Sequence, residues 1–372
     1  MTFNNNEQAF FALVKAGLWE KDTQLSAYSN LNYTEVYRLA EEQAVVGLVA
    51  SGLEHVPDVK IPKEDVLQFV GYALQIEPQN KSMNEFIACL IDRMRKESIY
   101  TLLLKGQSVG QCYERPFWRA CGDVDLFMSD DNYAKAQALL TSLATSVEKE
   151  DPYTKHIGMM IDKWQVEMHG NLRCGFSFKA DKMLDDVRKD TFFNGNVRSC
   201  NIERTQIFLL SAENDVVYVF THILHHFFRG GIGLRQICDW CRLLWTYRDK
   251  LNTRVVESRI SQAGLMTEWK AFAALAVNYL GMPQDAMPFY DTSRRWSRKA
   301  KRIVSRILHT GNFGHNIDES YRKKKSFIAR KGIAVWRYFS EAMSHFLIFS
   351  MDSLRAFGNT FKTGLLSTLK FR

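Results

Sequence analysis

The sequence predicts an α+β fold, in which a small mixed-sheet core lies between N- and C-terminal helical regions. Apolar residues recur at helical spacing through the first hundred residues and again from Thr205 onward. Between these regions, short apolar runs are separated by glycine, proline and polar turns, which is typical of strands. A chain of 372 residues has room for two or three domains.

The predicted organisation has four parts. They are an N-terminal helical region (1–97), an α/β core (98–204), a helical domain packing on that core (205–292) and a basic helical tail (293–372). The tail has 18 Lys+Arg and 4 Asp+Glu, a net charge of +14, whereas residues 1–292 have 31 and 37, a net charge of −6. An acidic body with a basic tail indicates two separate surfaces.

Cellular context follows from two further patterns. The N-terminus lacks the basic start and apolar stretch of a secretory signal, and no apolar run approaches the length of about 18 residues that a membrane span needs. Seven cysteines without paired spacing indicate free thiols in a reducing compartment. We therefore expect a cytoplasmic protein. Cys238 and Cys241 form a lone CxxC within a helical pattern, which more often reflects packing than zinc or redox chemistry.

Within the core, the elements are expected in a defined order. Strands are predicted at 99–104, 123–128, 156–161 and 165–169, and helices at 108–113 and 133–143. The first strand is stopped by Lys105 and Gly106. A long helix is predicted before the core, at 63–96, and the pattern returns to helix over 205–281.

Asp123 and Asp125 are the strongest candidates for chemistry. Alternate residues of a strand point to one side, so these carboxylates lie roughly 7 Å apart on one face. They repel one another unless a cation lies between them, and hard ions such as Mg²⁺ prefer carboxylate oxygens. Replacing either by asparagine is therefore expected to stabilise the metal-free protein slightly. Glu167, alternating with Val166 and Met168, is the expected third ligand of a two-metal site.

The turn after the first strand is a candidate phosphate site. Gly106 before a helix start lets backbone N–H groups approach a phosphate, Ser108 adds a hydroxyl and Lys105 a cation. Each feature alone says little, since an isolated DxD is more often a solvated pair. The order of strand, glycine turn, helix, DxD strand, helix and glutamate strand makes the combination informative.

That order resembles the DNA polymerase beta-like nucleotidyltransferase superfamily, and more closely the bacterial family of uncharacterised nucleotidyltransferases. The matching segments lie at 102–106 (LLLKG), 119–128 (RACGDVDLFM), 166–172 (VEMHGNL) and 221–240 (THILHHFFRGGIGLRQICDW). The resemblance covers about residues 30–280. Two departures are Gln107, where the superfamily has Gly or Ser, and Gly170, where the family tends to have an aromatic residue.

The resemblance implies roles for individual residues. Asp123 and Asp125 would bind both metals, Mg²⁺ or Mn²⁺, and Glu167 the metal on the nucleophile side. Gly106 and Ser108 would contact the triphosphate of an NTP such as ATP. The implied reaction transfers a nucleoside monophosphate to an acceptor and releases pyrophosphate; protein, tRNA, sugar and other small molecules all remain open as acceptors.

Several other polar residues have two interpretations each. Arg119 either neutralises phosphate charge or forms a salt bridge with one of the two aspartates. His222 and His226 share a helix face, but no HExxH carboxylate accompanies them, so metal binding is the less favoured interpretation. A role behind the metal ligands or facing the nucleotide is expected for the residues that the family pattern includes or that share the Glu167 face: His169, His222, His226, Arg235 and Asp239.

The basic tail allows three interpretations. Arg322 and the three lysines after it, followed by Trp336, Phe339, Phe346 and Phe349, suit an anionic membrane surface or RNA. The third interpretation is a helix docked on the acidic body. Two rivals to catalysis remain open for the whole chain: a nucleotide-binding protein without turnover, and an RNA-binding protein whose DxD is incidental.

Overall fold

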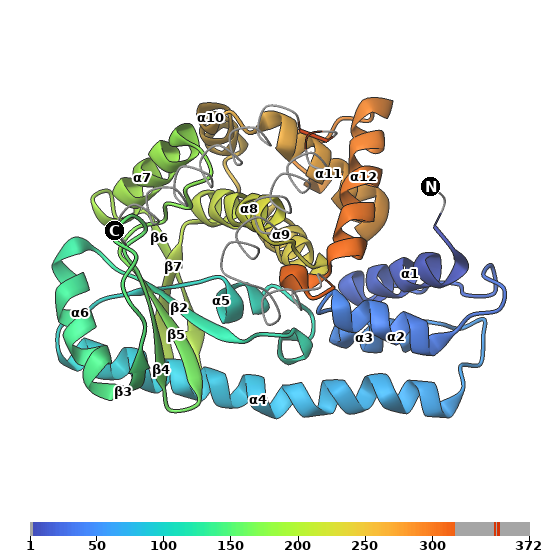
Figure 1. The fold of residues 1–372 in the computed structure, drawn as a ribbon, viewed down its shortest axis with the longest axis horizontal. Helices are drawn as coiled ribbons and strands as arrows, with labels where there is room; N and C mark the ends of the chain where they lie inside the picture. The colour runs from blue at the N-terminus through green and yellow to red at the C-terminus, as the bar shows by residue number, and fades with distance from the viewer. Residues whose placement is uncertain (1–2, 317–345, 347, 350–372) are drawn as a thin grey trace, which may run out of the picture.

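Strand β2 (Asp123–Phe127) lies inside a mixed sheet, and its alternating side chains explain its position. Val124 and Leu126 are buried in one hydrophobic cluster, whereas Asp123 and Asp125 point to the opposite face. The computed structural model describes residues 3–316, 346, 348 and 349. Figure 1 shows β2 beside β5, with a long helix running below them.

Within the described residues the sheet has seven strands, in the order β3-β4-β5-β2-β1-β7-β6. The pairs β2–β5 and β1–β7 are parallel, and the other neighbouring pairs are antiparallel. The mixed sheet with helical segments before and after it confirms the predicted α+β fold. The other strands are β1 (Leu102–Leu104), β3 (Ala144–Val147), β4 (His156–Ile161), β5 (Trp164–His169), β6 (Val197–Ile202) and β7 (Thr205–Leu210).

Helix α4 (Lys63–Lys96) joins the two ends of the molecule, and it has the bounds that its periodicity predicts. Its C-terminal half contributes Met83, Ile87 and Met94 to the same cluster as Val124. Its N-terminal half lies under the N-terminal helices (Figure 1). Those helices are α1 (Asn5–Trp19), α2 (Tyr33–Glu42) and α3 (Val46–Leu53).

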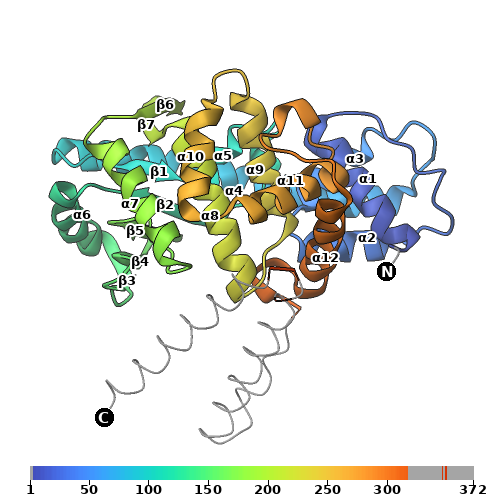
Figure 2. The same cartoon turned by 90° about the horizontal axis from the view of Figure 1, so that it is seen from above.

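The other face of the sheet is covered by helices that follow it in the chain. Helices α8 and α9 pack on one another, and α8 contacts β7 while α9 contacts α5. Seen from above, the strands lie at one end of the molecule and α1–α3 and α12 at the other (Figure 2). The remaining helices are α5 (Gly106–Gly110), η1 (Pro116–Trp118), α6 (Asp130–Leu143), α7 (Phe178–Phe192), α8 (Ala212–Arg229), α9 (Leu234–Tyr247), α10 (Thr253–Ala263), α11 (Met266–Leu280), η2 (Gln284–Ala286), α12 (Arg294–Thr310) and η3 (Asn312–Gly314).

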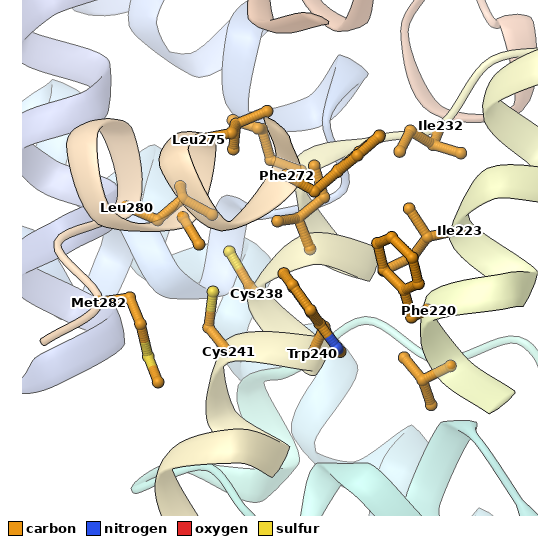
Figure 3. Packing of buried hydrophobic residues seen from close by; sticks show 14 of the residues in the cluster. Phe220, Ile223, Ile232, Cys238, Trp240, Cys241, Phe272, Leu275, Leu280 and Met282 are labelled. Atoms are coloured by element: carbon orange, nitrogen blue, oxygen red, sulfur yellow. The ribbon is translucent and has the colours of Figure 1, made fainter. Parts of the chain in front are cut away.

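The core between α8, α9 and α11 is aromatic. Phe220 and Trp240 stack with their ring centroids 5.1 Å apart, and Trp269 contacts both rings edge-on. Cys238 and Cys241 point into this core and are fully buried (Figure 3). Burial raises the pKa of both thiols, so the CxxC packs the core and is protonated at neutral pH. All seven cysteines are free, as predicted.

One expectation about secondary structure is wrong, and two other segments differ from what their sequence pattern suggests. The helical pattern predicted from Thr205 begins only at α8, because Thr205–Leu210 forms β7. Strand β6 precedes β7 and pairs with it in antiparallel orientation. It was not predicted, because every second residue is exposed and the strand has few apolar residues. Residues 33–53 have a continuous amphipathic pattern but form two helices, α2 and α3, because Ala44 has a φ of 55°, which ends α2.

Helix α12 is the described part of the basic tail, and its apolar side is already covered. Trp296, Ile303 and Ile307 are buried in the body, against α11. Phe349 is also buried and lies near Phe228, with ring centroids 6.0 Å apart. These contacts match the docked interpretation for the described part of the tail.

Arg322, the lysines after it, Trp336 and Phe339 lie outside the described residues. Among the helices of the described ranges, none combines the length and hydropathy that a bilayer crossing requires.

Candidate functional site

Three carboxylates meet on one face of the sheet because of the register between two parallel strands. Asp125 on β2 lies opposite Glu167 on β5, and Asp123 lies one alternate position before Asp125. One oxygen from each of these three residues lies within 4.8 Å of the others. Neighbouring parallel strands are about 4.8 Å apart, so the pairing itself brings Glu167 to the aspartates. The structure thus assembles the three residues predicted to bind metal.

Asp125 is the most deeply placed of the three, with a side chain only 1% exposed. Its Oδ1 atom is 2.9 Å from Lys105 Nζ and 2.8 Å from His169 Nε2. Its Oδ2 atom is buried and has no hydrogen-bond partner among the described residues. Burial opposes ionisation, but the charge of Lys105 and the His169 contact outweigh it, so the pKa of Asp125 lies below its usual range. A buried carboxylate oxygen without a partner is what a metal ligand requires.

Asp123 differs electrostatically from Asp125. Repulsion from Asp125, followed by burial, raises the pKa of Asp123 above its ordinary value. Burial lowers the pKa of the Lys105 ammonium group, but attraction to the Asp125 carboxylate outweighs burial, so the pKa of Lys105 is raised overall. One lysine therefore partly neutralises a cluster of three acids. Oxygen ligands and this excess negative charge fit a hard divalent cation such as Mg²⁺.

The turn between β1 and α5 brings Lys105 and Gly106 to the cluster. Both residues have positive φ angles, 45° and 43°. A Cβ atom on Gly106 would lie 3.3 Å from Cys121 Sγ and 3.4 Å from the Asp123 carbonyl oxygen, so a side chain would be strained there. Ser108 is buried, and its hydroxyl donates to the Lys105 carbonyl at 2.6 Å. Ser108 thus stabilises the turn, and its triphosphate contact stays a prediction.

Gln107, which replaces the usual glycine or serine of the superfamily, points away from the carboxylates. Its side-chain amide donates to Asn80 Oδ1 at 3.0 Å. Asn80 in turn donates to the carbonyl oxygens of Phe117 and Arg119, at 2.7 and 2.8 Å. This chain of hydrogen bonds joins α4 to the loop before β2 and explains why a larger residue is accommodated at position 107.

Arg119 forms a buried salt bridge, but with a partner far away in the sequence. Its Nε and Nη2 atoms lie 2.6 and 2.7 Å from the two carboxylate oxygens of Asp239 on α9. Tyr113 donates its hydroxyl to Asp239 as well, at 2.7 Å. Burial opposes the charge of Asp239, but Arg119 lowers its pKa overall. In this structure the carboxylate partner of Arg119 is Asp239, and neither Asp123 nor Asp125; a contact between Arg119 and phosphate stays a prediction.

The histidines of α8 lie behind Lys105. His222 and His226 have their Nε2 atoms 3.0 Å apart, and Phe313 contacts the His226 ring at 5.0 Å between centroids. Burial, then repulsion from His225, lowers the pKa of His226 to about 3; burial lowers that of His225 to about 4. These rings are neutral at pH 7. Within the described part of the chain, neither His222 nor His226 joins a group of three metal-ligating residues.

A cleft opens over the carboxylates between the sheet, α5, α8 and α9. Arg235 lies in its wall, donating from Nη1 to the Ala120 carbonyl at 3.0 Å, and its buried Nε has no partner among the described residues. Four predicted site residues are absent from the lining: Ser108, Glu167, His169 and His226. The residues that line the cleft are Lys105, Gly106, Val109, Arg119, Asp123, Asp125, Val219, His222, Ile223, Arg235, Gln236, Asp239 and Phe313.

His156 belongs to the cluster but was missed by the sequence analysis. It starts β4 and lies directly opposite His169 in the β4–β5 pair. Its Nε2 atom is 3.1 Å from Glu167 Oε2, and this hydrogen bond raises the pKa of His156. The two-residue turn after Ile161 sets that pairing, so counting back from the turn would have placed both histidines on one face.

A family model and a solved structure match the chain. The sequence profile described as "Uncharacterised nucleotidyltransferase" matches residues 29–281, more than half of the chain. The structure is similar to that of an antigenic nucleotidyltransferase-like protein from Paracoccidioides brasiliensis, with a TM-score of 0.31 and 13% sequence identity, covering 48% of this chain and 85% of that chain. No curated protein sequence matches the chain. The match over residues 29–281 shows that the chain belongs to the uncharacterised nucleotidyltransferase family.

Proposed function

We propose that this protein transfers a nucleoside monophosphate from an NTP to an acceptor by the two-metal mechanism of the DNA polymerase beta-like superfamily, with release of pyrophosphate. The observation that carries the proposal is the convergence of Asp123, Asp125 and Glu167, together with the buried Oδ2 of Asp125, which has no hydrogen-bond partner among the described residues. Two Mg²⁺ or Mn²⁺ ions held by these carboxylates would supply charge stabilisation for the attacking and leaving oxygens.

The residues around the carboxylates fit the binding of a triphosphate. Lys105 and Arg235 both line the cleft and bring positive charge toward the acids. A lysine that already carries its proton stabilises negative charge without a proton transfer, and a guanidinium suits phosphate oxygens geometrically. His222, neutral because burial lowers its pKa, lines the cleft wall beside them. We place the NTP phosphates over Gly106, between Lys105 and Arg235.

Label transfer tests this function. The full-length protein is incubated with each labelled NTP, Mg²⁺ and a cell extract, and pyrophosphate and labelled products are measured. We expect Mg²⁺-dependent pyrophosphate release and label on one class of acceptor: a protein, a tRNA, a sugar or another small molecule. Wild-type protein that binds NTP and Mg²⁺ but never releases pyrophosphate with any acceptor would favour a nucleotide-binding protein without turnover.

A second proposal concerns the tail, which we propose binds RNA or another polyanion. Arg294, Arg295 and Arg298 are exposed on α12, whereas the apolar side of that helix is buried. A helix whose apolar side is covered does not insert into a bilayer, so for α12 this arrangement leaves binding through charge, for which RNA phosphates are suitable partners. Deleting the chain from Ser293 would expose the core beneath Trp296, so substitution is the better test.

We expect glutamine at Arg294, Arg298 and Lys323–Lys325 to weaken RNA retention at low salt while pyrophosphate release is unchanged. Binding through phosphates weakens steeply with salt, and each lost contact reduces the logarithmic slope by about one. The measurement is filter retention of RNA and co-sedimentation with anionic vesicles at two salt concentrations. Equal RNA and vesicle binding by both proteins would leave the tail with a purely structural role.

A further inference from the structure

The histidines beside the carboxylates form a second ligand set. His156 Nε2 and His169 Nε2 lie 3.1 and 3.7 Å from the same atom, Glu167 Oε2. The two rings face one another across β4 and β5, with centroids 4.9 Å apart. The three ligand atoms of this group lie within 4.8 Å of one another. Glu167 therefore belongs both to an all-oxygen group and to a group with two imidazole nitrogens.

These separations suit one shared ion. Zinc–nitrogen and zinc–oxygen bonds are about 2.0–2.2 Å long, so two ligands of one ion are roughly 3.0 Å apart at a right angle and roughly 3.4 Å apart at a tetrahedral angle. The separations of 3.1 and 3.7 Å lie around these values. A cation between the three atoms would require only small side-chain movements.

A second observation points to a cation site. Asp125 is 1% exposed, yet its Oδ2 has no partner among the described residues, while Oδ1 is shared by Lys105 and His169. His169 thus connects the two ligand sets through Asp125 on one side and Glu167 on the other. Lys105 contacts Asp125 Oδ1, so most of the negative charge of the three carboxylates is left for a cation to balance.

We propose that His156, Glu167 and His169 form a metal subsite that selects a divalent first-row transition ion, such as Mn²⁺, Co²⁺ or Zn²⁺, over Mg²⁺. Imidazole nitrogen suits these ions, whereas Mg²⁺ prefers oxygen ligands and octahedral geometry. One of the two ions at the cluster would then be nitrogen-ligated. The subsite includes Glu167, which the proposed nucleotidyl transfer also uses. Metal binding at the subsite does not depend on that reaction, whereas a catalytic role for the bound ion rests on the proposed function.

The test is metal binding by the full-length protein after removal of metals with a chelator. Calorimetry with Mg²⁺, Mn²⁺ and Co²⁺ gives affinities, and the visible absorption of bound Co²⁺ reports nitrogen ligation. The variant is His156→Gln, because a glutamine amide keeps an N–H donor near the position of Nε2 while removing the imidazole ligand. The matched control is His55→Gln, since His55 Nε2 also contacts a glutamate, Glu20, at 2.7 Å.

We expect wild-type protein and His55→Gln to bind Co²⁺ at least about tenfold more tightly than Mg²⁺. His156→Gln should lose tenfold or more in Co²⁺ affinity and change its absorption spectrum, with Mg²⁺ affinity within about threefold of the wild type. Equal affinities of wild type for Co²⁺ and Mg²⁺, or unchanged Co²⁺ binding by folded His156→Gln, would overturn the subsite.

The metal result and the proposed function can fail separately. His156-dependent Co²⁺ binding without any pyrophosphate release would support the subsite and reject nucleotidyl transfer. Conversely, the protein could catalyse Mg²⁺-dependent transfer while folded His156→Gln binds Co²⁺ like the wild type. That result would support transfer and reject the subsite, and the two imidazoles would then be hydrogen-bonding residues. Thermal melting of each variant without metal shows whether it is folded.

Discussion

Asp123→Asn is expected to abolish Mg²⁺-dependent nucleotidyl transfer, reducing the rate on the order of 10³-fold or more, while the protein stays folded. Losing a charge-stabilising contact at the reacting phosphate has effects of this size. The substitution keeps the size of the side chain but removes a charge that a hard cation requires. Because repulsion from Asp125 raises the pKa of Asp123, the metal-free variant should also be slightly more stable.

Asp125→Asn should abolish transfer too, but its effect on stability has the opposite sign. The sequence predicts a small gain for either aspartate, because like charges on one strand face repel. The structure leads us to expect a loss for Asp125, which lies 2.9 Å from the partly buried Lys105 ammonium group. Neutralising Asp125 leaves that cation without its main counter-charge, so the metal-free protein should melt at a lower temperature.

Both variants are tested by measuring pyrophosphate release and the melting temperature. Each measurement is made with and without Mg²⁺ and NTP. Wild-type protein should be stabilised by the ligands and the variants should not. Asp162→Asn is the control, since Asp162 is exposed in the turn between β4 and β5 and asparagine tolerates its positive φ of 52°. Full activity of folded Asp123→Asn or Asp125→Asn would reject the two-metal assignment.

Asp239→Ala is expected to destabilise the protein by about 3–5 kcal/mol, because it leaves a buried guanidinium without its counter-ion. The Arg119 and Asp239 side chains are only 4% and 9% exposed and contact through two hydrogen bonds. Tyr113 would lose its acceptor at the same time. Chemical denaturation monitored by circular dichroism measures the free energy of unfolding.

The matched control is Asp185→Ala, which removes the carboxylate of another two-bond pair with an arginine. Arg173 and Asp185 also meet at 2.8 and 2.7 Å, but their side chains are 38% and 30% exposed. Pairs this accessible to water typically contribute no more than about 1 kcal/mol. The double variant Arg119→Met with Asp239→Leu should lose less stability than Asp239→Ala, because no charge remains buried. A cost for Asp239→Ala equal to that for Asp185→Ala would contradict the argument.

The three clustered carboxylates could be predicted because strand alternation is a local property. In β2 and β5, each acid alternates with apolar residues, and this places Asp123, Asp125 and Glu167 on the opposite side from the core. The β4–β5 hairpin was likewise predicted from two adjacent apolar runs, and β4 has the predicted bounds. The acidic face of the sheet is thus encoded within about 50 residues.

Other parts of the fold required the tertiary structure. Strand β7 pairs in parallel with β1, about a hundred residues earlier, and its short apolar run could equally begin the helix that follows it. Strand β6 alternates exposed and partly buried residues, so it is defined mainly by its pairing with β7. Strand identity in these cases comes from hydrogen bonds to a distant neighbour.

Local sequence determined which faces of β2 and β5 are acidic and therefore predicted a cation site. The tertiary structure alone decided the partners of those acids. Lys105 is close in sequence, but its contact with Asp125 depends on the β1–β2 register. Arg119 meets Asp239 across 120 residues. A spacing rule predicts in which direction the side chains of one strand or helix point. An ion pair between two elements instead depends on packing that brings distant segments within about 3 Å of one another. No local pattern contains that information.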